Sequence, residues 1–272
     1  MGGRWGPSAG PSAVPAPARG RGPVSCFGDS LTQGLVSAPW VEKLSRRLGR
    51  QCRNYGQNGW MADCVLRCAQ EAEPTEDATL LVGTNDAMID LASNEGNHAM
   101  VLAYRLLNWL PFAYEPGIGS FEDSLRRLLA ALPARRVAVA SLPPLGDTLG
   151  GAAHRAVAEY NAKVRKVVGE FPHAIYVPFA EAVGDHDGER AFDASAIGFA
   201  VNIFHMYWHA AQRWLPPGRP FESHCAPGSS SILHDNIHLT EAGAEVLCDL
   251  MSRALESPAL GETSALPCTL SS

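Results

Sequence analysis

The sequence predicts an α/β protein in which parallel strands are joined by crossover helices. After residue 23, short β-prone runs alternate with segments whose apolar residues recur at helical spacing. The chain has 272 residues, of which 46% are hydrophobic and 18% are charged, so it has enough apolar material for one substantial core. These observations favour one folded domain over two smaller ones.

Five segments have the composition of strands. The first is a short apolar run that ends at Gly28-Asp29, and the third is bounded by Asp77 and Gly83. The fourth contains a Val-Ala-Val-Ala run that stops before Pro143-Pro144. Strands are therefore expected at residues 24–27, 52–55, 78–82, 136–142 and 175–179.

Helices are expected between these strands and after the last of them. Val41, Leu44 and Leu48 fall on one face of a helix that follows the first strand. Apolar residues have the same spacing in segments 121–132 and 153–171, and a final helix follows Thr240. This alternation is the pattern that places parallel strands in one central sheet.

The two ends of the chain are expected to lie outside the domain. Residues 1–23 are rich in Gly, Pro, Ala and Ser and contain three arginines but no acidic residue, which predicts a disordered leader. The folded domain is then expected at 24–256, with insertions at about 87–119 and 185–231, and a flexible tail at 257–272.

Composition excludes some functions and leaves the compartment open. The formal net charge of −6 and the pI near 5.8 disfavour a nucleic-acid-binding protein, which normally needs a concentrated basic surface. No apolar run has the length of a signal-peptide core or a membrane span. The seven cysteines, an odd number, favour a reducing compartment. We therefore expect a cytoplasmic protein. An organellar location is the alternative, because residues 1–23 contain arginines but no Asp or Glu.

Three polar residues fit a nucleophile, its base and a group that orients the base. Ser30 follows the carboxyl end of the first strand, where α/β enzymes hold reactive groups. A serine hydroxyl is a weak nucleophile unless a base lies within hydrogen-bond reach. His238 and Asp235, directly before the last helix, fit the two supporting roles. Either motif alone is more often a simple turn or a helix entry.

Two further blocks lie between these motifs in a fixed order. Asn54 to Gly59 follows the second strand, and Gly83-Thr84-Asn85-Asp86 follows the third. A glycine lets a backbone N–H approach a developing oxyanion, and an asparagine amide is able to supply a second donor. Since parallel strands end at one edge of a sheet, all four blocks are expected to converge there.

The four blocks resemble those of the GDSL or SGNH hydrolase family, whose second name is taken from a Ser, a Gly, an Asn and a His. The resemblance extends from Val24 to about Leu255. It implies a three-layer α/β/α sandwich, flavodoxin-like, with a central five-stranded parallel sheet. It differs from the α/β-hydrolase pattern, whose serine lies in Gly-x-Ser-x-Gly.

Residue by residue, the resemblance implies that Ser30 is the nucleophile, His238 the general base and Asp235 the residue that orients it. The N–H groups of Ser30 and Gly59 and the amide of Asn85 would form the oxyanion hole, with Gly56 of the same turn as the alternative glycine. The expected activity is cleavage of acyl esters through an acyl-enzyme. No cofactor is needed for this chemistry, and the expected partner is a small-molecule or lipid-like ester.

The apolar insertions suggest where a substrate would bind. Trp60 directly follows Gly59, and Phe199 and Trp208 belong to an aromatic stripe upstream of the motif that contains His238. We expect these three residues to line the acyl site. The alternative is that the stripe is plain core.

No metal site is assigned. Cys64 and Cys68 lack a second pair with zinc spacing, and His205 and His209 lack the glutamate of a zinc-protease motif. His234 adjoins Asp235 and would either tune the pocket or, more commonly for a loop histidine, face solvent.

Other functions are compatible with parts of the sequence. An O-acetyl carbohydrate esterase is the alternative enzyme, because the family motifs do not select a substrate. A catalytically silent binding protein with the same fold is disfavoured by the complete residue set. A nucleotide-binding module is disfavoured by the lack of a glycine-rich dinucleotide fingerprint. The oligomeric state is not encoded in these motifs.

Overall fold

The computed structural model describes residues 22–98, 100–102, 120–146, 151–184, 195–225 and 232–257. Most of the expected leader and tail, and parts of both expected insertions, lie outside these residues. The predicted disorder of the leader and flexibility of the tail therefore stay predictions.

The strands form one parallel sheet of five, in the order β2-β1-β3-β4-β5. This confirms the predicted α/β class and the strand number. Strand β1 lies between β2 and β3, so the motifs that follow these three strands are neighbours at one edge of the sheet. The strands span Val24–Gly28 (β1), Cys52–Gly56 (β2), Thr75–Leu81 (β3), Ala134–Ala140 (β4) and Ala174–Val177 (β5).

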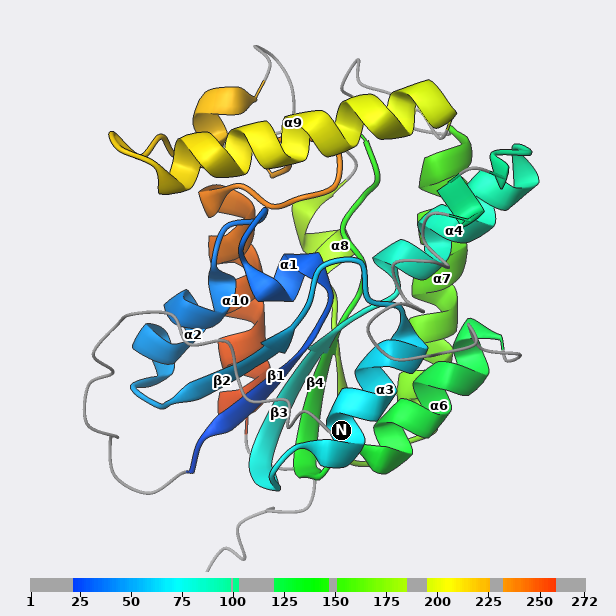
Figure 1. Cartoon of the computed structure of the whole chain (residues 1–272). Coiled ribbons are helices and arrows are strands. Elements are labelled where there is room, and N and C mark those ends of the chain that lie inside the picture. The colour runs from blue at the N-terminus through cyan, green and yellow to red at the C-terminus, as the bar shows by residue number, and fades with distance from the viewer. Residues whose placement is uncertain are drawn as a thin grey trace, which may run out of the picture.

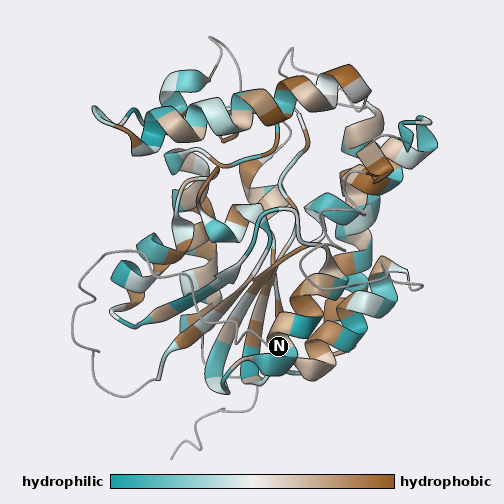
Figure 2. Cartoon of the chain, viewed as in Figure 1, coloured by the Kyte–Doolittle hydropathy of each residue, from teal (hydrophilic) through white to brown (hydrophobic). Residues whose placement is uncertain are grey.

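Helices cover both faces of the sheet and complete the α/β/α sandwich (Figure 1). One layer contains α2 (Trp40–Leu48), α8 (Phe179–Val183) and α10 (Glu241–Glu256). The other contains α3 (Ala62–Glu71), α4 (Thr84–Asn94), α6 (Phe121–Ala131) and α7 (Ala152–Val168). Buried apolar residues of the sheet and of these helices form a continuous core, and Figure 2 shows the hydrophobic colouring of the strands.

Three shorter or peripheral elements lie at the carboxyl edge of the sheet. Helix α1 (Ser30–Gln33) directly follows β1, and α9 (Ala196–Trp214) crosses above this edge with the 3-10 helix η1 (Phe221–His224) beside it (Figure 1). None of the helices in the described residues is long and apolar enough to cross a membrane.

Strand β3 begins three residues earlier than expected, because Asp77 lies within it and does not precede it. A carboxylate normally disfavours a strand interior, but Asp77 is neutralised by two guanidinium groups. Its Oδ2 lies 2.6 Å from Arg50 Nη1, and its Oδ1 lies 2.8 Å from Arg136 Nε. Asp77 is buried, so these ion pairs are what make it compatible with the start of a central strand.

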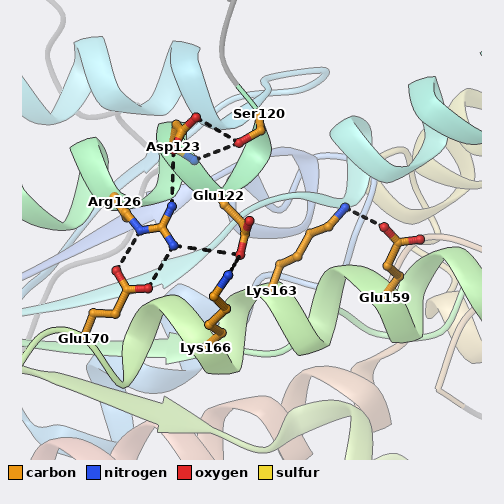
Figure 3. Close-up of polar contacts among 8 residues, drawn as sticks. All are labelled: Ser120, Glu122, Asp123, Arg126, Glu159, Lys163, Lys166 and Glu170. Carbon is orange, nitrogen blue, oxygen red and sulfur yellow. Dashed lines mark hydrogen bonds and ion pairs between the residues drawn. The ribbon is translucent and has the colours of Figure 1, made fainter.

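Ion pairs also connect α6 with α7 on the surface (Figure 3). Arg126 Nε lies 2.7 Å from Glu170 Oε2, and Lys166 Nζ lies 2.8 Å from Glu122 Oε1. Exposed pairs of this kind contribute about 0–1 kcal/mol each, so the layer is held mainly by its buried apolar face.

Candidate active site

Three of the four sequence blocks meet at the carboxyl edge of the sheet. Gly28 at the end of β1 is aligned with Gly56 of β2 and with Leu81 of β3. The residues that follow these positions are therefore neighbours in space. They include Ser30, Gly59 and Asn85.

Ser30 begins α1, and its position depends on a close approach of three chain segments. A Cβ at Gly28 would lie 2.2 Å from Thr32 Oγ1 and 2.3 Å from the Leu81 carbonyl oxygen, so this residue must be glycine. The side chain of Asp29 caps α1 by accepting the Leu31 N–H at 3.0 Å. Ser30 itself is only 7% exposed.

Ser30, His238 and Asp235 form a continuous hydrogen-bonded series. Ser30 Oγ lies 2.9 Å from His238 Nε2, and His238 Nδ1 lies 2.7 Å from Asp235 Oδ2. All three side chains are buried. The structure thus brings together the three residues that sequence reasoning assigned to one reaction, although 208 positions separate Ser30 from His238.

The charge of Asp235 determines which nitrogen of His238 carries a proton. Burial alone would raise the pKa of Asp235, but nearby His238 and His234 and several hydrogen bonds hold that pKa below its ordinary value. An ionised carboxylate only accepts, so Nδ1 of His238 is the protonated nitrogen. In the neutral ring, Nε2 is then the acceptor for the Ser30 hydroxyl.

A tight turn presents Asp235 and His238 to each other. Asn236 has a positive φ of 72°, which asparagine tolerates better than most residues. Oδ1 of Asp235 accepts the N–H groups of Ile237 at 3.2 Å and His238 at 2.7 Å. Leu233 and Leu239 form an antiparallel bridge that closes the loop. The turn therefore fixes the carboxylate before any substrate arrives.

The histidine loop is also joined to the loop that follows Ser30. The Ala38 N–H donates to the Leu239 carbonyl at 2.9 Å, and the Leu239 N–H donates to Ser37 Oγ at 3.1 Å. These bonds connect segments from opposite ends of the chain. They fix the separation of Ser30 and His238 through the backbone as well as through the side chains.

Asn85 and Gly59 lie on the neighbouring loops. The Asn85 amide Nδ2 donates to the Trp60 carbonyl at 2.8 Å, which fixes the orientation of the amide. Gly59 has a positive φ of 77°, and nothing lies within 4 Å of the position a Cβ would take. Gly56 is different, because a Cβ there would lie 2.3 Å from the Gln33 nitrogen. Packing thus explains Gly56, whereas backbone conformation explains Gly59.

Two further buried carboxyl groups lie beside the proposed site. Burial raises the pKa of Asp29 to about 7 and that of Asp86 to about 7. Asp86 accepts the Ala62 N–H at 3.2 Å and so connects the start of α4 to the start of α3. Sequence reasoning gave neither residue a role, although each directly neighbours a proposed site residue.

His234 is fully buried, so the expectation that it faces solvent is wrong. Its Nε2 lies 2.9 Å from the Val36 carbonyl and its Nδ1 lies 3.0 Å from His209 Nδ1. A carbonyl only accepts, so Nε2 is the donor. In the neutral pair the hydrogen between the rings then belongs to His209. Burial lowers the pKa of His234 and, together with neighbouring His234 and His224, lowers that of His209 to about 4.

The expected substrate-lining residues have different environments. Trp60 is buried next to Asn85, whereas the Trp208 side chain is 55% exposed. The side chain of Phe199 lies outside the described residues. Tyr207, Trp208 and Trp214 are all exposed, so the interpretation of this stripe as plain core is wrong. In the part of the chain that the structure describes, no group of three or more His, Cys, Asp or Glu could hold a metal ion.

A parallel α/β/α fold with a Ser–His–Asp series at its carboxyl edge is typical of serine hydrolases. The profile of the GDSL-like Lipase/Acylhydrolase family matches residues 26–246. The chain therefore belongs to this family and is a hydrolase that acts on ester bonds. A search of curated proteins gave no match.

Solved structures support the fold. LAE5, an alpha/beta hydrolase enzyme from the metagenome of Lake Arreo, is 15% identical with a TM-score of 0.51, covering 90% of this chain and 100% of that one. A catalytic mutant of Axe2, an acetylxylan esterase from Geobacillus stearothermophilus, is 15% identical with a TM-score of 0.50, covering 87% and 95%. The acetyl xylan esterase AlAXEase is 13% identical with a TM-score of 0.50, covering 86% and 99%. At these identities the likeness concerns the fold alone.

Proposed function

We propose that this chain cleaves carboxylic acyl esters through an acyl-enzyme on Ser30. The observation that carries the proposal is the buried series from Ser30 Oγ to His238 and on to Asp235, with separations of 2.9 and 2.7 Å. Both distances are within hydrogen-bond range, so no rearrangement is needed before the first proton transfer.

In the first half-reaction, His238 Nε2 takes the hydroxyl proton while Ser30 Oγ attacks the ester carbonyl carbon. The carbonyl π electrons move to oxygen, and the N–H groups of Ser30 and Gly59 and the Asn85 amide stabilise that charge. The imidazolium then gives its proton to the departing alcohol oxygen. Asp235 stabilises the imidazolium throughout.

In the second half-reaction, a water molecule gives a proton to His238 and adds to the acyl carbon. Collapse of the second tetrahedral intermediate breaks the bond to Oγ, and the proton returns to Ser30. The products are a carboxylic acid and an alcohol, and the enzyme is unchanged. Only residues of this chain and water take part.

Substrates with a lipid-like or short-to-medium acyl chain are our first choice, because apolar residues flank the site. Trp60 and Phe199 remain the proposed acyl-lining residues, whereas Trp208, expected with them, lies on the exposed face of α9. O-acetyl carbohydrates are the second candidate, since two of the similar structures are acetylxylan esterases. A panel of p-nitrophenyl esters of increasing chain length, with acetylated xylan beside it, distinguishes the two.

The test of the nucleophile is labelling with a fluorophosphonate probe. Wild-type protein should label at Ser30, and Ser30→Ala should lose labelling and at least about 10⁴-fold of kcat while remaining folded. The change removes one hydroxyl and little packing, so circular dichroism should not change. Labelling of Ser30→Ala at another serine, or an unlabelled and inactive wild type, would reject the proposal and favour a silent binding protein.

A further inference from the structure

Helix α9 has its apolar residues on the outside. Large apolar side chains at positions 197, 201, 204 and 208 follow the spacing of one helix face, and that face is exposed. Ile197 is 78% exposed and Phe204 is 64% exposed. The face toward the protein contains Asn202, His209 and Ala210, with Ile203 and Met206 half-buried beside them. A helix on a globular protein usually buries its large apolar side chains, whereas four of those in α9 face outward.

The exposed apolar residues extend beyond the helix toward Ser30. Leu35, which follows α1, is exposed, and its carbonyl accepts the Trp214 indole N–H at 2.6 Å. Leu215, at the end of α9, is exposed as well. We call this set of residues the α9 surface. It comprises Leu35, Ile197, Val201, Phe204, Tyr207, Trp208, Trp214 and Leu215.

The charges around the α9 surface indicate what would cover it. Residues 195–220 contain no carboxylate, although the whole chain has a net charge of −6. Arg213 is half-buried and pairs with Glu241 at 3.0 Å, which leaves Arg219 as the exposed charge of this segment. A second copy would bring its own Arg219 and no carboxylate from this surface. A phosphate-bearing lipid surface offers the opposite charge together with an apolar interior.

The residue types also fit a lipid surface. Tryptophan and tyrosine rings concentrate where a bilayer meets water, because one end of each ring is apolar and the other forms hydrogen bonds. Phe204 and Trp208 stack with parallel rings 6.4 Å apart, giving a broad aromatic face. In Figure 2, several turns of α9 have the hydrophobic colour although the helix lies at the periphery, above the carboxyl edge of the sheet.

We propose that the α9 surface docks on a phosphate-bearing lipid surface, so that Ser30 receives esters presented there. The delivery of esters to Ser30 rests on the proposed esterase function, whereas docking itself does not require catalysis. The helix would lie in the plane of the interface with its outer face in the headgroup region. Two hydrogen bonds join α9 to the site. Trp214 donates to Leu35 in the loop after Ser30, and His209 is bonded to His234, the neighbour of Asp235.

Flotation of the full chain with vesicles tests docking. The vesicles contain phosphatidylcholine and phosphatidylglycerol in equal parts. Wild-type protein should float with them, and the double variant Ile197→Ser with Phe204→Ser should lose at least about tenfold in partitioning. Leu102→Ser is the matched control, because Leu102 is an exposed apolar residue on a different segment. It should float like wild type.

Activity assays separate docking from chemistry. All three proteins should hydrolyse soluble p-nitrophenyl acetate equally, whereas the double variant should be slower by about the same tenfold on p-nitrophenyl palmitate carried in the vesicles. Inactivity of wild type on both esters with normal flotation would reject the esterase function and leave docking intact. Wild type that fails to float, or a double variant that floats equally well, would overturn docking. A concentration-dependent dimer abolished by the double substitution, without flotation, would assign the surface to self-association.

Discussion

Two buried aspartates lie at opposite ends of the same sheet and have different partners. Asp77, at the amino end of β3, is paired with the guanidinium groups of Arg50 and Arg136, which are charged at every physiological pH. Asp235, at the carboxyl edge, is paired with the imidazole of His238. Burial is the same in both cases. The difference is that the partner of Asp235 is able to gain and lose a proton.

This difference separates a structural role from a catalytic one. Each oxygen of Asp77 is paired with a permanent cation, so this cluster holds the ends of the strands together and offers no group that exchanges a proton with a serine. At the carboxyl edge, the ionised Asp235 orients the neutral imidazole and leaves its Nε2 beside the Ser30 hydroxyl. We therefore expect substitutions at the two positions to affect different quantities.

Asp235→Asn should lower kcat by about 10⁴-fold, because an amide no longer holds His238 in the tautomer that accepts from Ser30. The Asn side-chain oxygen is still able to accept the backbone N–H bonds of the turn, so the free energy of unfolding should change little. Steady-state kinetics on a soluble ester and a urea melt measure the two effects. A large stability loss with near-normal kcat would reverse the assignment.

Asn85→Ala should lower kcat by about 10²–10³-fold with a smaller change in KM, as expected when one donor to a transition-state oxyanion is lost. The bond from Asn85 to the Trp60 carbonyl is also lost, so Asn85→Asp serves as a companion variant of nearly the same size. It should be equally slow, since a carboxylate repels an oxyanion. A defect confined to KM in both variants would mean that Asn85 only holds the substrate.

Asp77→Asn should have the opposite profile. Removing the carboxylate leaves the buried guanidinium of Arg50 and the half-buried one of Arg136 without a counter-charge, which costs about 3–5 kcal/mol of unfolding free energy. The kcat of the folded fraction should be unchanged. Glu73→Gln is the control, because Glu73 pairs with Arg53 on the surface and should cost no more than about 1 kcal/mol. Equal costs for the two substitutions would remove the distinction between the buried cluster and a surface pair.

Sequence patterns predicted the sheet and the convergence of the motifs, because both depend on local features. Apolar runs marked the strands, and the ends of parallel strands meet at one edge. The role of Asp77 was not predictable in this way. Its partners lie 27 and 59 positions away, so the aspartate had the appearance of a strand boundary.

The same limit applies to His234 and to α9. The contacts of His234 with Val36 and His209 are long-range, and no local pattern distinguishes them from an exposed loop. In α9, helical spacing was recognisable, but periodicity does not state which face is inside. The aromatic residues were assigned to a wall or a core because apolar faces are usually buried. The structure exposes Tyr207, Trp208 and Trp214, which overturns the assignment to a core.

The buried carboxyl group of Asp86 is a third case. It lies at the carboxyl edge, and no ion pair joins it to a cation among the described residues. Burial raises its pKa to about 7, whereas the unfolded chain has a pKa near the ordinary value of 3.8. Between these values the folded protein retains a proton that the unfolded chain releases. Stability should therefore fall as pH rises from about 4 to about 7, by at most about 1.4 kcal/mol per pH unit from this group.

Asp86→Asn removes this titration while keeping an oxygen that is able to accept the Ala62 N–H. The variant should gain stability relative to wild type as pH rises from 5 to 7, and the two should differ least at pH 4. Urea melts at each pH measure the difference directly, so that other titrating groups, Asp29 included, cancel to first order. Parallel stability curves for wild type and Asp86→Asn would show that Asp86 is already ionised in the folded protein. Burial would then not distinguish the carboxyl group of Asp86 from those of Asp77 and Asp235.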